Sequence, residues 1–281
     1  MRIALHSPSQ FSRLLNYLSR APLSRFLMRL LFRRHYGNTV QEIFGIRFES
    51  PFGLACGYDE NGEFYDTLAD FGSGFVEIGP ITIREKDGKG VEEAVSRLRE
   101  NKAKTRLIAK ITKNESTLTD NAAQDFARSM ALLYDFVDMF VIDCQSGGVT
   151  EDIESLSEVI DRMLETRRYY DVKRPVFVNI TKGTARSEVD DIIAYTMRSG
   201  LDGVVVKDTA WVEYIYRKTS GNLVIIASGE GVGTAEMAYR LLCEGASLVE
   251  FDQAFLRRGP VIFREANQLL HTLRKDTKHD D

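Results

Sequence analysis

The side chains best suited to chemistry in this sequence stand just after short apolar runs. The clearest stretch is DCQSGGVT (143–150), where an acid, a thiol and a hydroxyl precede two glycines. If the preceding strand continues, Cys144 and Ser146 point the same way. Either could accept a proton in a site. Neither has a base at a spacing visible in the sequence, so the residues alone leave the proton acceptor open between Ser146 and Cys144.

A second stretch, ASGEGVGTAEMA (227–238), places a glycine-rich turn between an apolar run and a helical pattern. Backbone N–H groups in such a turn can hold a phosphate group, as in many barrel enzymes. Ser228, Gly229 and Gly231 are the candidate residues. Glu230 opposes this interpretation, because its carboxylate would face a dianion. The alternative is a tight strand–helix turn that needs glycine for its backbone.

Metal-based and histidine-based catalysis are not expected. The four histidines lie away from the ends of the apolar runs, and the three cysteines lack metal-ligand spacing. So few cysteines, odd in number, also argue for a reducing compartment and against a disulfide framework.

Elements that would position these residues follow from the hydrophobic pattern. Eight short runs rich in Val, Ile and Leu alternate with helical patterns, which is typical of parallel strands buried on both faces. The runs are Gly53–Gly57, Phe75–Pro80, Leu107–Ile111, Met139–Cys144, Val176–Ile180, Gly203–Asp208, Leu223–Gly229 and Leu248–Gln253. Eight units favour a closed (β/α)8 TIM barrel over a doubly wound sheet. Active sites of such barrels form at the carboxyl ends of the strands, where polar residues follow each run.

The N-terminal segment differs in charge from the rest of the chain. Residues 1–41 contain seven arginines and no acid, whereas the remainder carries 30 basic and 41 acidic residues. Two short amphipathic helices are expected within residues 8–35, with Pro22 in the first turn of the second. Arginines beside a Leu/Phe face are typical of a helix at a membrane interface. The alternative is a helical hairpin packed on its own domain. We therefore expect an arm at 1–41 and a barrel domain at 42–281.

Other bulk properties limit the location and the partners. No apolar run is long enough to span a membrane, and no secretory signal is recognised at the start. A cytoplasmic protein is expected, peripheral at the inner face of a membrane if the arm binds lipid. A small-molecule ligand is expected, and no nucleic-acid partner.

Several motifs then resemble one family over nearly the whole chain. FGIRFESPFGLACGYDENGE (44–63), GFVEIGPIT (74–82), DGVVVKDT (202–209) and GASLVEFDQAF (245–255) are similar to strand segments of the membrane-associated, quinone-linked dihydroorotate dehydrogenases. The resemblance implies a barrel that holds flavin mononucleotide (FMN). Dihydroorotate would give a hydride to the flavin and a proton to a loop base, here Ser146, and the arm would lead quinone to the flavin. The product would be orotate, for pyrimidine biosynthesis.

The same resemblance implies which residues face the ligands. The FMN positions are Ala55, Cys56, Gly57, Lys110, Asp143, Asn179, Lys207, Ser228, Gly229, Gly231, Asp252 and Gln253. The substrate positions are Glu60, Gly148, Asp208 and Thr209.

Many of these positions depart from the family pattern. Lys110 and Asp143 stand where the family has asparagines, and Asn179 where it has a lysine. Glu60 replaces a lysine that contacts the orotate carboxylate, and Asp208 replaces a substrate asparagine. An unpaired charge of the wrong sign costs several kcal/mol when buried. Three functions therefore stay open: a flavin-dependent dihydroorotate dehydrogenase, a non-catalytic barrel that binds or regulates, and a barrel with a changed ligand.

Overall fold

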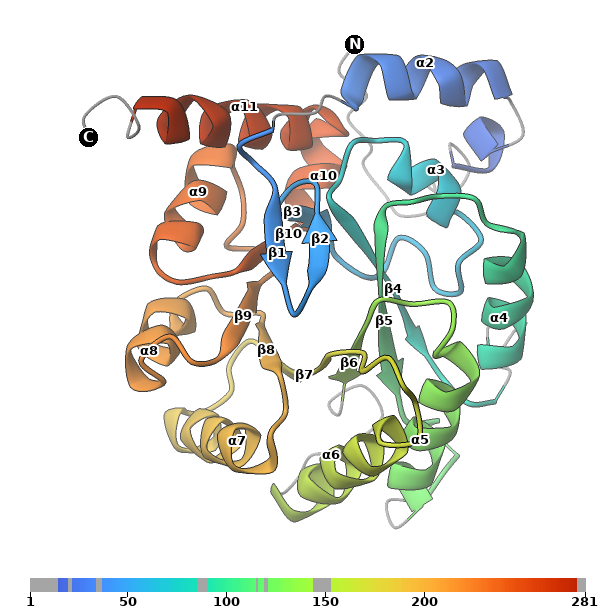
Figure 1. The fold of residues 1–281 in the computed structure, drawn as a ribbon, viewed down its shortest axis with the longest axis vertical. Coiled ribbons are helices and arrows are strands. Elements are labelled where there is room, and N and C mark those ends of the chain that lie inside the picture. The colour runs from blue at the N-terminus through green and yellow to red at the C-terminus, as the bar shows by residue number, and fades with distance from the viewer. Residues whose placement is uncertain are drawn as a thin grey trace.

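A closed barrel of eight parallel strands forms the body of the protein (Figure 1). The computed structural model describes residues 15–19, 22–33, 37–84, 90–114, 116–118, 121–143 and 153–276. Around the barrel the strands run in the order β10-β3-β4-β5-β6-β7-β8-β9. Their bounds are β3 (Phe52–Leu54), β4 (Phe75–Ile81), β5 (Arg106–Thr112), β6 (Met139–Asp143), β7 (Val176–Ile180), β8 (Gly203–Val206), β9 (Val224–Ala227) and β10 (Leu248–Phe251). All eight predicted strands and the (β/α)8 fold are confirmed.

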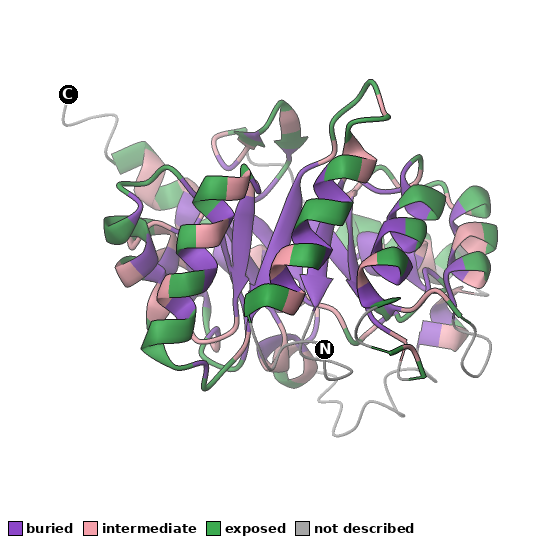
Figure 2. Ribbon diagram, turned by 90° about the horizontal axis from the view of Figure 1, so that it is seen from below, coloured by how far each residue is buried: buried purple, intermediate pink, exposed green. Residues whose placement is uncertain are grey.

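Helices surround the barrel and cover its outer face (Figure 2). They are α3 (Tyr65–Ala69), α4 (Val91–Glu100), α5 (Ala122–Leu133), α6 (Ile153–Arg167), α7 (Arg186–Ser199), α8 (Trp211–Lys218), α9 (Ala235–Cys243), α10 (Gln253–Arg258) and α11 (Val261–Asp276). Helix α4 illustrates why they pack there. It buries Val91, Ala94 and Leu98 at helical spacing and exposes charged residues on its other face.

A hairpin that the sequence analysis missed closes the amino-terminal end of the barrel. Strands β1 (Gln41–Ile43) and β2 (Ile46–Phe48) pair antiparallel around Phe44 and Gly45, both at positive φ. Such a two-residue turn suits the twist of a hairpin. Ile43 and Phe48 pack against the side chains at the bottom of the barrel interior. Figures 1 and 2 show the hairpin lying across this end.

The bottom of the interior is an apolar layer. It consists of Phe75, Ile108, Met139, Val141, Phe177, Val205, Ile226 and Leu248, all buried. Each lies on a strand at a position whose side chain points inward, so the residue two positions later on the same strand also points inward. This alternation decides which side chains meet inside the barrel at the carboxyl ends of the strands.

The N-terminal arm packs on the outside of the barrel. Residues 15–19 are helical and bury Leu15 and Leu18, and α2 (Pro22–Phe32) follows, with Pro22 as its first residue, as predicted. The rest of the predicted first helix lies outside the described residues, and the boundary between an arm at 1–41 and a barrel domain at 42–281 stays a prediction. Within the described part of the chain, no helix is long and apolar enough to span a membrane.

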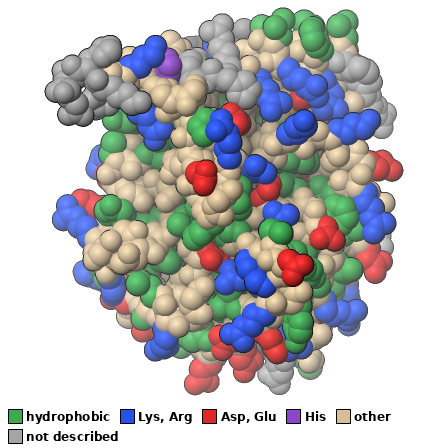
Figure 3. Space-filling view, in the orientation of Figure 1, with side chains coloured by type: hydrophobic (Ala, Val, Ile, Leu, Met, Phe, Trp, Pro, Cys, Tyr) green, Lys and Arg blue, Asp and Glu red, His purple; other side chains and the backbone are tan. Residues whose placement is uncertain are grey.

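Arginines of α2 face the barrel, whereas its apolar residues face outward. Arg25 Nε lies 2.7 Å from an oxygen of the buried Asp70, and Arg29 Nε lies 2.5 Å from the other oxygen. The outward residues are Leu23, Phe26, Leu27, Leu30 and Leu31, each between 46% and 72% exposed. Figure 3 shows hydrophobic side chains gathered along the edge that α2 occupies. Helix α2 is thus paired with the barrel through its arginines and presents most of its apolar residues to the surroundings, whereas residues 15–19 pack on the barrel through Leu15 and Leu18.

Candidate functional site

Above the apolar layer, the barrel interior becomes polar toward the carboxyl ends of the strands. Seven residues each follow, two positions later, an inward-facing apolar residue, so their side chains point inward as well. They are Glu77, Lys110, Asp143, Asn179, Lys207, Ser228 and Glu250. We call these seven residues the lumen cluster. Five of the seven are among the FMN positions predicted from the sequence, whereas Glu77 and Glu250 are not.

A buried ion pair joins β4 to β5 within the lumen cluster. Lys110 Nζ lies 3.3 Å from Glu77 Oε2, and both side chains are at most 2% exposed. The same glutamate oxygen accepts the backbone N–H of Cys56 at 3.0 Å, and Lys110 Nζ donates to Cys56 Sγ at 3.1 Å. Lys110, Cys56 and one oxygen of Glu77 therefore contact one another across three neighbouring strand ends.

Charge on this pair is maintained in the folded protein. Burial would lower the pKa of Lys110, but the Glu77 carboxylate raises it well above its usual value. Burial would likewise raise the pKa of Glu77, but Lys110 and Lys207 lower it. For the thiol of Cys56, burial and the Glu77 charge raise the pKa to about 12, so the thiol stays protonated.

Glu250 is a fully buried carboxyl group in the same layer. No described residue meets the distance and angle of a regular hydrogen bond to its oxygens, although the Ser228 side chain is close enough to oppose the rise in its pKa. Burial and the nearby Glu77 raise its pKa to about 8, against the opposite effect of Lys207 and Lys110. Glu77 Oε1 and Asn179 Oδ1 are buried acceptors that lack a partner in the described part of the chain. The sequence did contain a signal that could have identified Glu77 and Glu250 as site residues. Each is a charged residue within an otherwise apolar strand, at a position whose side chain points into the barrel.

Two further contacts complete the cluster. Lys207 Nζ donates to Ser228 Oγ at 2.9 Å, and Asn179 Nδ2 donates to Asp143 Oδ1 at 3.2 Å. Asp143 and Asn179 are both buried. The cluster contains two lysines and three carboxyl groups but, within the residues described, no group of acids, histidines or cysteines suited to a metal ion.

The glycine-rich turn after β9 is packed against the chain itself. A Cβ on Gly229, at φ +93°, would lie 2.4 Å from the Lys207 carbonyl oxygen, and one on Gly231 would lie 2.5 Å from Thr209 Oγ1. Glu230 in the turn is exposed, and its carboxylate lies 2.9 Å from Lys182 Nζ. These glycines are thus required for contact with the neighbouring loop.

The loop after β3 is the open side of the site. Gly57 is exposed at φ +98°, and a Cβ there would meet no atom within 4 Å. Ala55 is buried, and its N–H donates to the Phe251 carbonyl. Glu60 is exposed, whereas its neighbour Asp59 is buried and accepts the N–H of Phe64 at 3.0 Å. Burial raises the pKa of Asp59 to about 6, although its backbone hydrogen bonds oppose the rise.

The other predicted residues have local structural partners or cannot be placed. Tyr58 donates to Asp252 Oδ1 at 3.1 Å, and Gln253 begins α10. Asp208 accepts the N–H of Ala210 at 3.1 Å, as in a turn. The candidate base positions Ser146 and Cys144, and the substrate position Gly148, lie outside the described residues.

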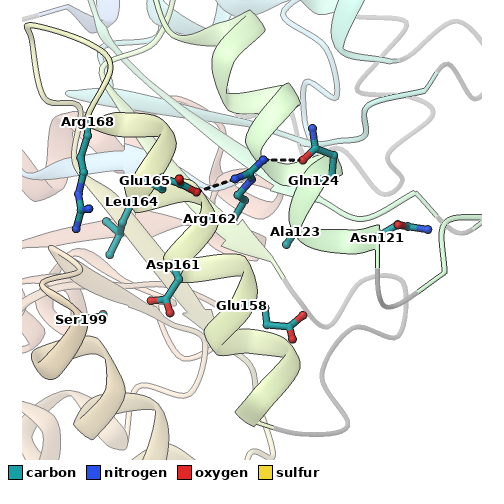
Figure 4. A pocket seen from close by; sticks show the side chains of 10 residues that line it. All are labelled: Asn121, Ala123, Gln124, Glu158, Asp161, Arg162, Leu164, Glu165, Arg168 and Ser199. Atoms are coloured by element: carbon teal, nitrogen blue, oxygen red, sulfur yellow. Dashed lines mark hydrogen bonds and ion pairs between the residues drawn. The ribbon is translucent and has the colours of Figure 1, made fainter.

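A large groove elsewhere does not belong to this site. It has a volume of about 850 Å³ and lies on the outer ring of helices, over α5 and α6 (Figure 4). Arg162 in this groove donates to Glu165 at 2.7 Å and to Gln124 at 3.1 Å. The lining is mixed in charge and contains no residue of the lumen cluster, so we assign it no role in the chemistry.

Comparisons with known proteins agree on one group of relatives. No family model matches the chain. Curated dihydroorotate dehydrogenases (quinone) from Christiangramia forsetii and Nocardia farcinica are 25% and 26% identical to it, and the alignments cover 81% and 83% of this chain. They also cover 83% and 80% of those relatives.

Solved structures agree with the fold. A ligand-free DHODH from Eimeria tenella superposes with a TM-score of 0.76 at 22% identity, covering 88% of this chain and 93% of the other. The same enzyme in complex with ferulenol gives a TM-score of 0.77. At this identity, the structural likeness supports the fold alone.

Proposed function

The chain is a homologue of the quinone-linked dihydroorotate dehydrogenases, and from this relationship we propose that it is a barrel protein of that type whose interior no longer takes FMN. The homology supports a function of the dihydroorotate dehydrogenase type. One observation carries the proposed change: the lumen cluster joins its own charges where the ring of a flavin would be held. The protein then acts as a ligand-binding barrel with a changed ligand, in place of a flavin-dependent oxidoreductase.

The ring end of the site does not fit a flavin. Two donors at the FMN positions, Lys110 Nζ and the Cys56 N–H, already contact the Glu77 carboxylate. Two buried acceptors of the lumen cluster, Glu77 Oε1 and Asn179 Oδ1, lack partners among the described residues. The flavin ring system offers mostly acceptors as well. Placing it against these oxygens would leave buried polar atoms unsatisfied, at about 1–3 kcal/mol each.

The phosphate end does not fit either. Gly229 and Gly231 face the chain's own Lys207 and Thr209, so their lack of side chains gives no additional room to a ligand. Glu230 places a carboxylate on the same turn, and its lysine partner is exposed. A phosphate dianion there would meet a like charge.

An absorbance spectrum tests the proposal directly. Protein as isolated should lack the visible bands of a flavin, and titration with FMN should give a Kd weaker than about 1 μM, a binding free energy of about 8 kcal/mol. The matched variant exchanges the two lumen positions, Lys110→Asn with Asn179→Lys, which restores the pattern that the family resemblance implies. We expect this variant to bind FMN more tightly than the wild type. A yellow wild-type protein would refute the proposal.

We also propose that α2 contacts a membrane surface through its apolar face. This proposal is supported by the outward position of Leu23 (72% exposed) and Leu30 (68% exposed), on a helix whose Arg25 and Arg29 are held by Asp70. Burying such side chains in lipid gains roughly 25 cal/mol per Å².

Vesicle flotation tests the membrane contact. The variant Leu23→Gln with Leu30→Gln should lose most of its binding. Leu118→Gln is the control. Leu118 is 73% exposed, like the leucines of α2, but it lies in the connection between β5 and α5 and not on α2. Equal flotation of both variants would exclude α2 as the contact.

The second candidate function is dihydroorotate oxidation itself. It is favoured by the activity named for the curated relatives, which align over more than four-fifths of this chain. By the family resemblance, Ser146 would take the proton and quinone would be the electron acceptor near residues 8–35. Quinone-dependent formation of orotate by protein saturated with FMN would select this candidate over the first.

A further inference from the structure

A small cavity lies at the opposite end of the barrel from the lumen cluster. Its volume is about 70 Å³. It lies among the end of α2, strand β2, the loops before β4 and β5, and α11. The residues that line it are Arg33, Arg47, Glu49, Ser50, Gly72, Ser73, Gly74, Lys104, Thr105, Arg106 and Asn267.

The lining carries an excess of positive charge. It contains Arg33, Arg47, Lys104 and Arg106 against a single acid, Glu49. Arg47 Nε lies 3.0 Å from Glu49, and Arg106 lies 3.1 Å from Asp138. Arg33 and Lys104 form no ion pair with any residue that the structure describes. Figure 3 shows lysine and arginine side chains gathered on this face of the molecule, near α2.

Two buried polar atoms in the lining lack partners. Ser73 is 7% exposed and Asn267 is 5% exposed. Neither Ser73 Oγ nor Asn267 Oδ1 has a hydrogen-bond partner among the described residues, whereas Asn267 Nδ2 donates to the Phe263 carbonyl at 2.9 Å. A buried hydroxyl without a partner is costly, so the Ser73 hydroxyl is a donor available to a ligand.

Close backbone packing builds the floor of this cavity. A Cβ on Gly74 would lie 1.9 Å from the Ser50 carbonyl oxygen, and one on Gly72 would lie 2.6 Å from the Phe32 carbonyl oxygen. The loop before β4 therefore packs against the segment between β2 and β3 on one side and the end of α2 on the other. Ser73, between these two glycines, is held in place.

We propose that this cavity binds a phosphate group. The volume of about 70 Å³ is roughly twice the 30 Å³ that a water molecule occupies in the liquid, which suits a small oxyanion. Arginine, lysine and hydroxyl donors are the groups that bind phosphate oxygens. The excess of cations disfavours a metal ion. The group can be free inorganic phosphate or part of a lipid headgroup, since Arg33 directly follows α2.

Titration with inorganic phosphate at constant ionic strength, followed by calorimetry, tests the site. The wild type should bind phosphate with saturation. Lys104→Gln and Ser73→Ala should each weaken binding about tenfold, as expected for a hydrogen bond to a charged group. Because Lys104 is exposed, its variant should fold normally. The control is Arg217→Gln on α8, which removes a 77% exposed arginine from a distant surface and should bind like the wild type.

The source of the phosphate is distinguished with vesicles. If the site takes a headgroup, wild-type protein should float with phosphatidic acid vesicles more than with phosphatidylcholine vesicles, and Lys104→Gln should remove the difference. If it takes free phosphate, the two vesicles should behave alike while calorimetry still shows saturable binding. No saturable binding of phosphate, or equal binding by Lys104→Gln and the wild type, would overturn the proposal. The outcome is independent of whether the lumen holds FMN.

Discussion

The variant Glu250→Gln tests the electrostatics of the barrel interior. Glutamine keeps the size and shape of the side chain but cannot ionise. In the wild type, burial and Glu77 raise the pKa of Glu250 to about 8, while Lys207 and Lys110 act against the rise. The usual value, which applies to the unfolded chain, is 4.5. The folded protein therefore holds one more proton than the unfolded chain between these two values.

The magnitude follows from linkage. Where the folded state binds the additional proton, the free energy of unfolding falls by about 1.4 kcal/mol per pH unit as pH rises. Over the window from pH 4.5 to about pH 8, the loss reaches about 5 kcal/mol as an upper limit. Glu250→Gln lacks this loss. Its stability relative to the wild type should be unchanged near pH 4.5, increase steadily with pH, and level off above pH 8.

Denaturant unfolding at a series of pH values measures this difference. The control is Glu230→Gln, which removes an exposed carboxylate from the rim of the same barrel end. Its difference from the wild type should be small and nearly flat over the same range, because exposed ion pairs contribute little. A difference between Glu250→Gln and the wild type that does not change with pH would refute a neutral, buried Glu250.

Three other changes have defined outcomes. Lys110→Met should destabilise the fold by about 3–5 kcal/mol, because it leaves the Glu77 carboxylate buried without its cation; Lys110→Met with Glu77→Gln should recover most of the loss in a denaturant double-mutant cycle. Asp70→Ala should reduce the free energy of unfolding by about 1.5–3 kcal/mol and make the arm more sensitive to trypsin, since Arg25 and Arg29 lose their buried acceptor; unchanged proteolysis would argue against a role of these ion pairs in holding the arm. Alkylation at pH 8 followed by mass spectrometry should modify the exposed Cys243 and spare Cys56, whose pKa is raised to about 12.

The sequence alone determined the barrel. Its strands are buried on both faces, so each is a short run of Val, Ile and Leu that stands out between amphipathic helices. The eight runs predicted the eight strands, and the rule that polar residues gather at the carboxyl ends of the strands predicted a site at that end of the barrel. The hairpin β1–β2 was missed, because its strands of three residues are too short for a periodic pattern.

Tertiary structure alone decided which charges meet. Helical periodicity gave α2 an apolar face and an arginine face, but only the position of Asp70 on the barrel turned the arginines inward. In the same way, Lys110 and Glu77 are 33 positions apart in the sequence, and Glu250 comes from the last strand. These groups share one buried layer because the barrel closes β10 onto β3. Periodicity is a property of neighbours along the chain, whereas the partner of a charge depends on closure of the whole barrel.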